Sequence, residues 1–155
     1  MIVLAPPGHA DRDALLAFEL ANRAFFEARI NARAADYYSA DGVTQAIQAA
    51  IDDAAADHGY QFLVKADDGA ILGRINLRDV TRTPVSSAVL GYRIGEAHGG
   101  KGHASAALLA LLEVAFGRLG LERIEAGVRA SNLASARVLL RNGFVQFAHT
   151  PTASR

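Results

Sequence analysis

The sequence contains no cysteine among its 155 residues. This absence excludes disulfide bonds, catalysis by a thiolate and the cysteine-based zinc sites. The five histidines do not have the spacing of metal ligands, so we expect no metal. No apolar run reaches membrane-spanning length, and the N-terminal residues lack a basic stretch followed by a long apolar one. We therefore expect a cytoplasmic protein with no membrane partner.

The chain also lacks an excess of charge of either sign. Sixteen basic residues balance sixteen acidic ones, so the formal net charge at pH 7 is zero. No overall field would attract nucleic acid, and we expect no nucleic-acid partner. Hydrophobic residues make up 51% of the chain and charged residues 21%, which is typical of a globular protein. Length and composition predict a single domain over residues 1–155.

Apolar periodicity and turn residues predict an α/β chain in which a glycine-rich loop joins a strand to a helix. Capping residues and the turn Asp67-Asp68-Gly69 set several of the boundaries. An aromatic, poorly periodic segment at 23–41 separates the first two helices. The expected elements, in chain order, are a strand at 2–5, helices at 11–22 and 44–57, strands at 61–66, 71–80 and 88–95, a helix at 103–119, a strand at 122–128, a helix at 131–142 and a strand at 144–148.

The glycine-rich loop is the segment GEAHGGKGHAS, residues 95–105, which directly precedes the apolar run ALLALLEVAF. A glycine-rich turn at the start of a helix presents backbone N–H groups to a phosphate. Gly100, Gly102 and Ala104 have small side chains or none, so a phosphate can approach the backbone closely. Lys101 and His103 add positive or polar groups beside it. The segment therefore predicts a phosphate-binding loop.

Two nucleotide-binding motifs come close to this loop, and both fail. Gly95 and Gly100-Lys101 have the spacing of a P-loop, but residue 102 is glycine where a Ser or Thr should hold magnesium. The neighbouring strands also form hairpins, whereas a P-loop protein needs a parallel sheet. A dinucleotide fingerprint would need Gly or Ala in place of Ser105. The favoured ligand of the loop is therefore coenzyme A, whose pyrophosphate can bind to backbone N–H groups without a metal. A P-loop-like nucleotide-binding protein remains a distant alternative.

The motifs LGYRIGEAHGGKGHASAAL, LGLERIEAGV and NLASARVLLRNGF occur in this order. Together they resemble the acetyl-CoA-binding core of the GNAT acyltransferase superfamily, over about residues 71–147. The similarity is greatest to the branch of ribosomal-protein N-terminal alanine acetyltransferases. It implies the GNAT fold, a mixed, mostly antiparallel twisted sheet flanked by about four helices. It also implies acetyl transfer from acetyl-CoA, as co-substrate, to a protein N-terminal amine or a small-molecule amine. The alternative is a non-catalytic acyl-CoA-binding module.

The resemblance assigns the cofactor-binding residues. In the family's loop pattern Gln/Arg-x-x-Gly-x-Gly/Ala, Gly102 and Ala104 match, whereas Gly99 departs from it. The backbone near Ile94 is expected to pair with the pantetheine arm. The Asn-x-x-Ser motif is implied to lie near the pantetheine and the sulfur. From the residues alone helix capping is the favoured role, and both roles can hold at once. The expected cofactor-binding residues are Ile94, Gly99, Gly100, Lys101, Gly102, His103, Ala104, Asn132 and Ser135.

The catalytic residues are less clearly marked. Many family members use a tyrosine of the last helix as the acid, and here that position is Leu139. Ser135 is therefore expected to hydrogen-bond the leaving thiolate, if any residue does. Glu96 ends its strand beside the acetyl site and is the expected base, with Glu19 and Glu27 as alternatives. The alternative for each of the three is an ordinary solvated surface carboxylate, which is the commoner case for an acidic residue.

The chain ends in HTPTASR, where the family has another strand. We therefore expect that strand to be missing, which would leave an unpaired edge on the strand at 122–128. Residues 144–148 could move in to pair with this edge. Alternatively they could pair with a second subunit and give a homodimer with exchanged strands.

Overall fold

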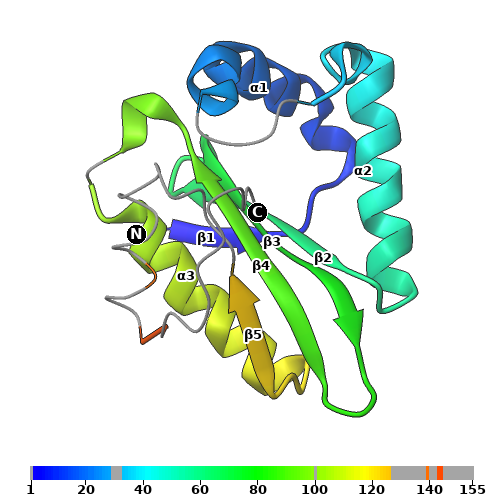
Figure 1. Ribbon diagram of the computed structural model, residues 1–155. Helices are drawn as coiled ribbons and strands as arrows, with labels where there is room; N and C mark the ends of the chain where they lie inside the picture. Colours follow the sequence, from blue (N-terminus) through cyan, green and yellow to red (C-terminus); the bar gives the residue numbers. More distant parts are fainter. Residues whose placement is uncertain (1, 29–32, 100, 127–138, 140–142, 145–155) are drawn as a thin grey trace.

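The computed structural model describes residues 2–28, 33–99, 101–126, 139 and 143–144. Within them the chain forms a five-stranded sheet in the order β1-β2-β3-β4-β5 (Figure 1). The expected order of elements is confirmed as far as β5, and the strand at 2–5 lies at an edge of the sheet. The helices and strands are β1 Ile2–Ala5, α1 Arg12–Glu27, α2 Ala40–Ala55, β2 Tyr60–Ala66, β3 Ile71–Thr81, β4 Ser87–Ile94, α3 His103–Glu113 and β5 Arg123–Ala126.

The strands from β1 to β4 pair antiparallel, and β4 pairs with β5 in parallel. The hairpin expected at Asp67-Asp68-Gly69 joins β2 to β3, and Gly69 has the positive φ of +88° that such a tight turn favours. The helix α3 makes the crossover between the two parallel strands. This sheet is mixed and mostly antiparallel, as the resemblance implied, and it differs from the parallel sheet of a P-loop protein.

A β-bulge at Leu72 decides which side chains of β3 face which layer. Val64 pairs with Gly73 and Lys65 pairs with Ile71, so Leu72 has no partner on β2. Simple alternation along β3 predicts Leu72 on the same face as Arg74, and this is wrong. The extra residue moves Leu72 to the face covered by α3 and leaves Arg74 on the opposite face.

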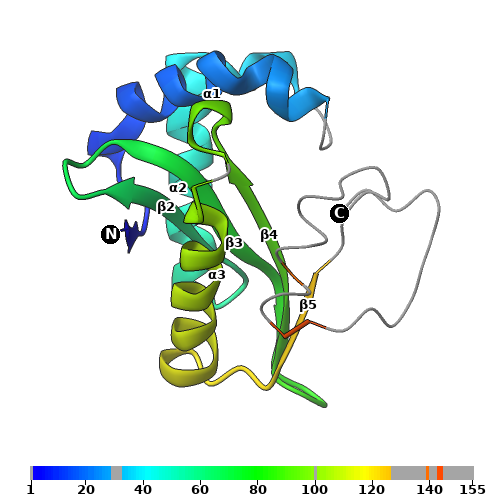
Figure 2. The same cartoon turned by 90° about the vertical axis from the view of Figure 1, so that its left-hand side faces the viewer.

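The sheet is covered on both faces, α3 lying against one and α1 and α2 against the other (Figures 1 and 2). Burial on both faces explains why three consecutive residues of β2, Phe62–Val64, are buried. The core on the α3 face includes Phe62, Val64, Leu72, Ile75, Leu77, Ala88, Leu90, Ala107, Leu108, Leu111 and Ala115. The core under α1 and α2 consists of Leu15, Phe18, Phe26, Tyr37, Val43, Ile47 and Leu63.

Both helices on the second face extend beyond their expected boundaries. The helix α1 continues to Glu27 because this extra turn buries Phe26, whose ring lies 5.8 Å from that of Phe18. The helix α2 begins at Ala40 because the Ser39 hydroxyl caps it by accepting from the Gly42 N–H at 3.0 Å. Both ends of the aromatic segment expected to be irregular, 23–27 and 40–41, are therefore helical.

The ends of the later helices follow the glycines. After Glu113 the chain makes one π-helical turn, Val114–Arg118, and Gly120 then has a φ of +64°, as expected for a left-handed cap. Leu139 is helical and buried, and the Phe144 N–H donates to its carbonyl across Gly143, which confirms the predicted helix end. The expected helix at 131–142 is otherwise outside the described residues.

The expected strand at 144–148, the missing last strand and the exchanged dimer also fall outside the described part of the chain, beyond Phe144. The strand expected at 122–128 is described as far as Ala126. None of the helices in the described part of the chain has the length and apolar character needed to cross a membrane.

Candidate active site

The strand β4 extends further than its described ladder with β5. Parallel pairing runs from Ser87 opposite Arg123 to Leu90 opposite Ala126. On its other side β4 stays paired with β3 up to Ile94, which lies opposite Gly73. The last four residues of β4, Gly91–Ile94, thus extend beyond the ladder with β5, and they include the backbone near Ile94 that is expected to pair with the pantetheine arm.

The glycine-rich loop leads from the end of β4 into α3. A short 3-10 turn, Glu96–His98, comes first, and Gly102 is the N-cap residue of α3 with a φ of +77°. A Cβ atom on Gly102 would meet no atom of the described structure within 4 Å, so the space in front of it is open. No side chain of the described residues caps α3. Its first N–H groups have no intrahelical acceptor, and this end of the helix can bind an anion.

The remaining loop residues surround that helix end. Lys101 and Gly99 are exposed, and the rings of His98 and His103 lie 6.4 Å apart in an edge-to-face arrangement. Gly99, the departure from the family pattern, has a φ of −69°, which any residue can adopt. Lys101, Gly102, His103 and Ala104 thus lie together at the start of α3. Gly100, Asn132 and Ser135 are outside the described residues.

Asn22 of α1 holds the start of this loop in place, a role that its sequence position as an expected helix end did not reveal. Its Oδ1 accepts a hydrogen bond from the Glu96 N–H at 2.8 Å, and its Nδ2 donates to the Phe18 carbonyl at 2.9 Å. The neighbouring Gly95 N–H donates to the Leu72 carbonyl. A Cβ on Gly95 would come within 3.0 Å of the Phe18 ring, so only glycine fits without a shift.

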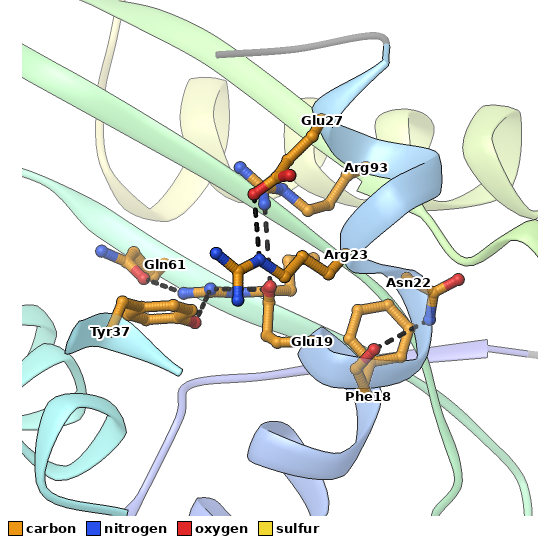
Figure 3. A network of polar contacts seen from close by, with 9 residues as sticks. Phe18, Glu19, Asn22, Arg23, Glu27, Tyr37, Gln61 and Arg93 are labelled. Atoms are coloured by element: carbon orange, nitrogen blue, oxygen red, sulfur yellow. Dashed lines mark hydrogen bonds and ion pairs between the residues drawn. The ribbon is translucent and has the colours of Figure 1, made fainter. Parts of the chain in front are cut away.

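A buried ionic cluster lies between α1 and the sheet, on the face of the sheet that α1 and α2 cover (Figure 3). Glu19 is fully buried, and its Oε1 lies 3.2 Å from Arg74 Nη1. The Arg74 guanidinium also donates to the Tyr37 hydroxyl at 2.9 Å and to Gln61 Oε1 at 2.6 Å. The four groups come from α1, β2, β3 and the turn before α2. The cluster therefore joins the helical layer to the sheet.

Arg93 of β4 stands at the open side of this cluster. Its Nη1 lies 3.7 Å from Glu19 Oε2, and its guanidinium lies 5.1 Å from the centre of the Phe26 ring. Burial lowers the pKa of Arg93 to about 10, with the nearby positive charge of Arg33 adding to the effect. Arg93 therefore remains protonated at neutral pH.

The three carboxylates considered as bases differ in their surroundings. Glu19 is held by the arginines of the cluster, and Glu27 pairs with Arg23 at 3.1 Å. The Glu96 side chain is exposed and lines a shallow hollow of about 470 Å³ between α1 and the loop, together with His98. Glu96 as the base stays a prediction. Leu139, where many family members have the acid, is buried in the core.

The comparisons with known proteins agree with this architecture. A family model described as "Acetyltransferase (GNAT) domain" matches residues 2–145. This chain belongs to the GNAT acetyltransferase family. It is also 35% identical over 144 residues to the probable N-acetyltransferase YjcK of Bacillus subtilis, covering 92% of this chain and 80% of YjcK. The chain is therefore an acyltransferase, as the sequence motifs predicted.

Solved structures of this GNAT fold superpose over nearly the whole chain. Mycobacterium smegmatis RimJ, solved in complex with CoA-disulfide, is 26% identical with a TM-score of 0.88, covering 95% of this chain and 71% of RimJ. The ribosomal-protein-S5-alanine acetyltransferase of Vibrio fischeri is 21% identical with a TM-score of 0.87, covering 99% of this chain and 86% of that one. The expected likeness to ribosomal-protein-alanine acetyltransferases is confirmed as a likeness of fold.

Proposed function

We propose that this GNAT acyltransferase moves the acetyl group of acetyl-CoA to a primary amine, either a protein N-terminal α-amine or a small-molecule amine. One observation supports this most strongly. The start of α3, which no described side chain caps, follows the left-handed Gly102 and adjoins the end of β4, where that strand extends beyond its described ladder with β5. A pyrophosphate at the helix start and a pantetheine arm along Gly91–Ile94 would lie in one continuous path.

In the proposed reaction the amine nitrogen attacks the thioester carbonyl carbon directly. The tetrahedral oxyanion accepts a hydrogen bond from backbone N–H near Ile94, and the C–S bond then breaks as the amine loses a proton. Coenzyme A leaves as a thiolate with a pKa of about 8.5, so it needs only modest stabilisation. Ser135 is the proposed hydrogen-bond donor to that sulfur, because the position of the usual tyrosine is the buried Leu139.

None of the candidate bases is clearly placed to take a proton from the acceptor amine. This favours an acceptor whose amine is already neutral in a fair fraction of its molecules before it binds. Glu19 and Glu27 are engaged with arginines, and Glu96 is exposed. An α-amine with a pKa near about 8 is neutral in roughly a tenth of its molecules at pH 7. A lysine side chain at about 10.4 is neutral in only a few molecules per ten thousand. A low-pKa amine therefore needs the least help from the enzyme.

The test is thiol release from acetyl-CoA with a panel of peptide and small-molecule amines, with the acetylated product identified by mass. We expect turnover with at least one α-amine or other low-pKa amine, and little with lysine side chains. The alternative, a non-catalytic acyl-CoA-binding module, predicts CoA binding without turnover across the whole panel. Failure to bind CoA at all would reject both functions.

A further inference from the structure

The ionic cluster under α1 contains more positive than negative charge. Its two carboxylates belong to α1, and one of them, Glu19, is fully buried. Its arginines come from α1, the segment before α2, β3 and β4. Glu19 pairs with Arg74 and Arg93, and Arg33 lies over the ring of Tyr37, whose hydroxyl Arg74 hydrogen-bonds. Arg23 and Glu27 form a separate pair on α1, so positive charge exceeds negative by two. The members are Glu19, Glu27, Arg23, Arg33, Arg74 and Arg93.

The hydrogen-bonding capacity of the cluster is unevenly used. Arg74 donates to three partners, Glu19, Tyr37 and Gln61. Arg93 reaches Glu19 only at 3.7 Å, which is too long for a hydrogen bond. The Nε of Arg33 is buried and donates no hydrogen bond in the described structure, although its guanidinium lies 4.5 Å from the Tyr37 ring centre. Arg93 and Arg33 therefore hold donors that a further acceptor could use.

An anion bound beside Arg93 and Arg33 would balance the excess positive charge and accept hydrogen bonds from these two arginines, with the unbonded Glu19 Oε2 lying behind Arg93. Charged groups removed from water are normally paired, and an arginine fork matches a carboxylate or a phosphate in geometry. The Arg93 side chain is 19% exposed, so a ligand can reach it, whereas Glu19 lies behind it at 0%. The site therefore suits an oxyanion that approaches from the side of α1.

The position of Arg93 connects this site to the reaction. Arg93 directly precedes Ile94, beside which the thioester is proposed to lie, and its side chain points toward Glu19 and Phe26 of α1 (Figure 3). We propose that Arg93 and Arg33 bind an anionic group of the acceptor, so that the acceptor is an amine carrying a carboxylate or a phosphate. This inference rests on the proposed function, because it assumes that the amine reaches the end of β4.

The test compares acceptors of similar size with and without the anion, and the rates are compared per neutral amine because the anion also raises the pKa of the amine. The pairs are β-alanine with β-alaninamide, the tripeptide amides Ser-Asp-Ala and Ser-Asn-Ala, and phosphoethanolamine with ethanolamine. We expect kcat/KM to favour the anionic member by about tenfold or more in at least one pair, as for a charge-assisted hydrogen bond. The carboxylate and phosphate pairs show which oxyanion is preferred. Arg93→Gln should remove most of that preference, and Arg33→Gln should reduce it.

Arg78→Gln is the matched control, since Arg78 lies on β3 and pairs with Asp79 outside the cluster. It should keep the preference unchanged. Equal rates within every pair, or a preference that survives both Arg93→Gln and Arg33→Gln, would overturn the proposal. If no amine is acetylated, the proposed function fails separately. Calorimetric titration of the CoA-bound protein with the same pairs then decides: anion binding lost in Arg93→Gln supports the site, and no anion binding rejects it.

Discussion

At the scale of single residues, the glycines of the loop differ in whether their backbone conformation requires glycine. Gly102 has a left-handed φ of +77° and open space before it, whereas Gly99 has an ordinary φ of −69°. Gly102 is therefore needed for its conformation and for close approach to the ligand. Gly99 is needed for neither, and substitution there should be tolerated.

We predict that Gly102→Asp abolishes CoA binding in a folded protein. The new carboxylate would stand at the start of α3 and repel the pyrophosphate. Gly102→Asn is the control, because it has nearly the same shape and adopts the left-handed conformation equally well, but carries no charge. Calorimetry with CoA should show measurable binding for the Asn variant only. Equal affinities of the two variants would show that no phosphate lies there.

We predict that Gly99→Arg, which restores a side chain of the family pattern, tightens CoA binding by several-fold. A Cβ at residue 99 would meet the Glu96 carbonyl oxygen at an ordinary 3.7 Å, so the side chain fits. The gain should shrink as salt increases, because the added charge is on an exposed loop. Titration at two ionic strengths measures both effects. An unchanged affinity at low salt would place residue 99 away from the phosphates.

At the scale of elements, the site is built where α1 meets the end of β4. Asn22 fixes the loop through the Glu96 N–H, and the Glu19–Arg74 pair fixes α1 to the sheet. A second set of polar contacts between elements lies at the other end of β3, away from the site. There Arg82 forms a bidentate pair with Asp57 at 2.7 and 2.9 Å and donates to the Leu119 carbonyl at 2.8 Å. The contacts of Asn22 and Glu19 position the site, and the contacts of Arg82 stabilise the fold away from it.

We predict that Asn22→Ala lowers the free energy of unfolding by about 1–3 kcal/mol, because it leaves the Glu96 N–H without its acceptor. Acetyl-CoA affinity should fall as well, since the loop loses its attachment to α1. Asn22→Asp keeps an acceptor oxygen and should lose less of both. Hydrogen exchange at the Glu96 amide gives the local readout. An exchange rate that stays unchanged in Asn22→Ala would contradict this account of the loop.

We predict that the Asp57–Arg82 pair makes stability depend on pH at the acid end. Hydrogen bonds from Arg82 first, and then from Tyr60, lower the pKa of Asp57 from 3.8 to about 2. Because the folded pKa is depressed, the stabilisation is present above about pH 4 and is lost as pH falls toward 2. Thermal melts of Asp57→Asn should show a lower Tm at pH 7 and a smaller loss of Tm over that window. Identical profiles for both proteins would contradict it.

At the scale of the whole molecule, local sequence signals predicted the elements and the glycine-rich loop, but not the contacts between layers. The turn at Asp67–Gly69 and the caps Gly120 and Gly143 have short-range causes, and the structure confirms them. The bulge at Leu72 depends on how β3 pairs with β2. The hydrogen bond from Asn22 to the loop depends on packing between segments more than 50 residues apart in the sequence.

The ionic cluster could be predicted only in part. Glu19 and Asn22 share the buried face of α1 with Leu15, Phe18 and Phe26, and polar residues at these apolar spacings are the signal that was available. Their partners could not be inferred, because Arg74 lies 55 residues away in the sequence and no local pattern links the two segments. The resemblance to the GNAT family supplied the cofactor that composition and periodicity alone left open.

The most direct test of the central claim, acetyl-CoA bound between the end of β4 and the start of α3, is backbone amide NMR during titration with CoA. The largest chemical-shift changes should occur at Gly91–Ile94 and at residues 99–104, while the amides around Asp57 and Arg82 stay unchanged. Changes centred elsewhere, for example on Ala14 and Ala17 in the shallow hollow beside α1, would contradict the account, as would the absence of any change at saturating CoA.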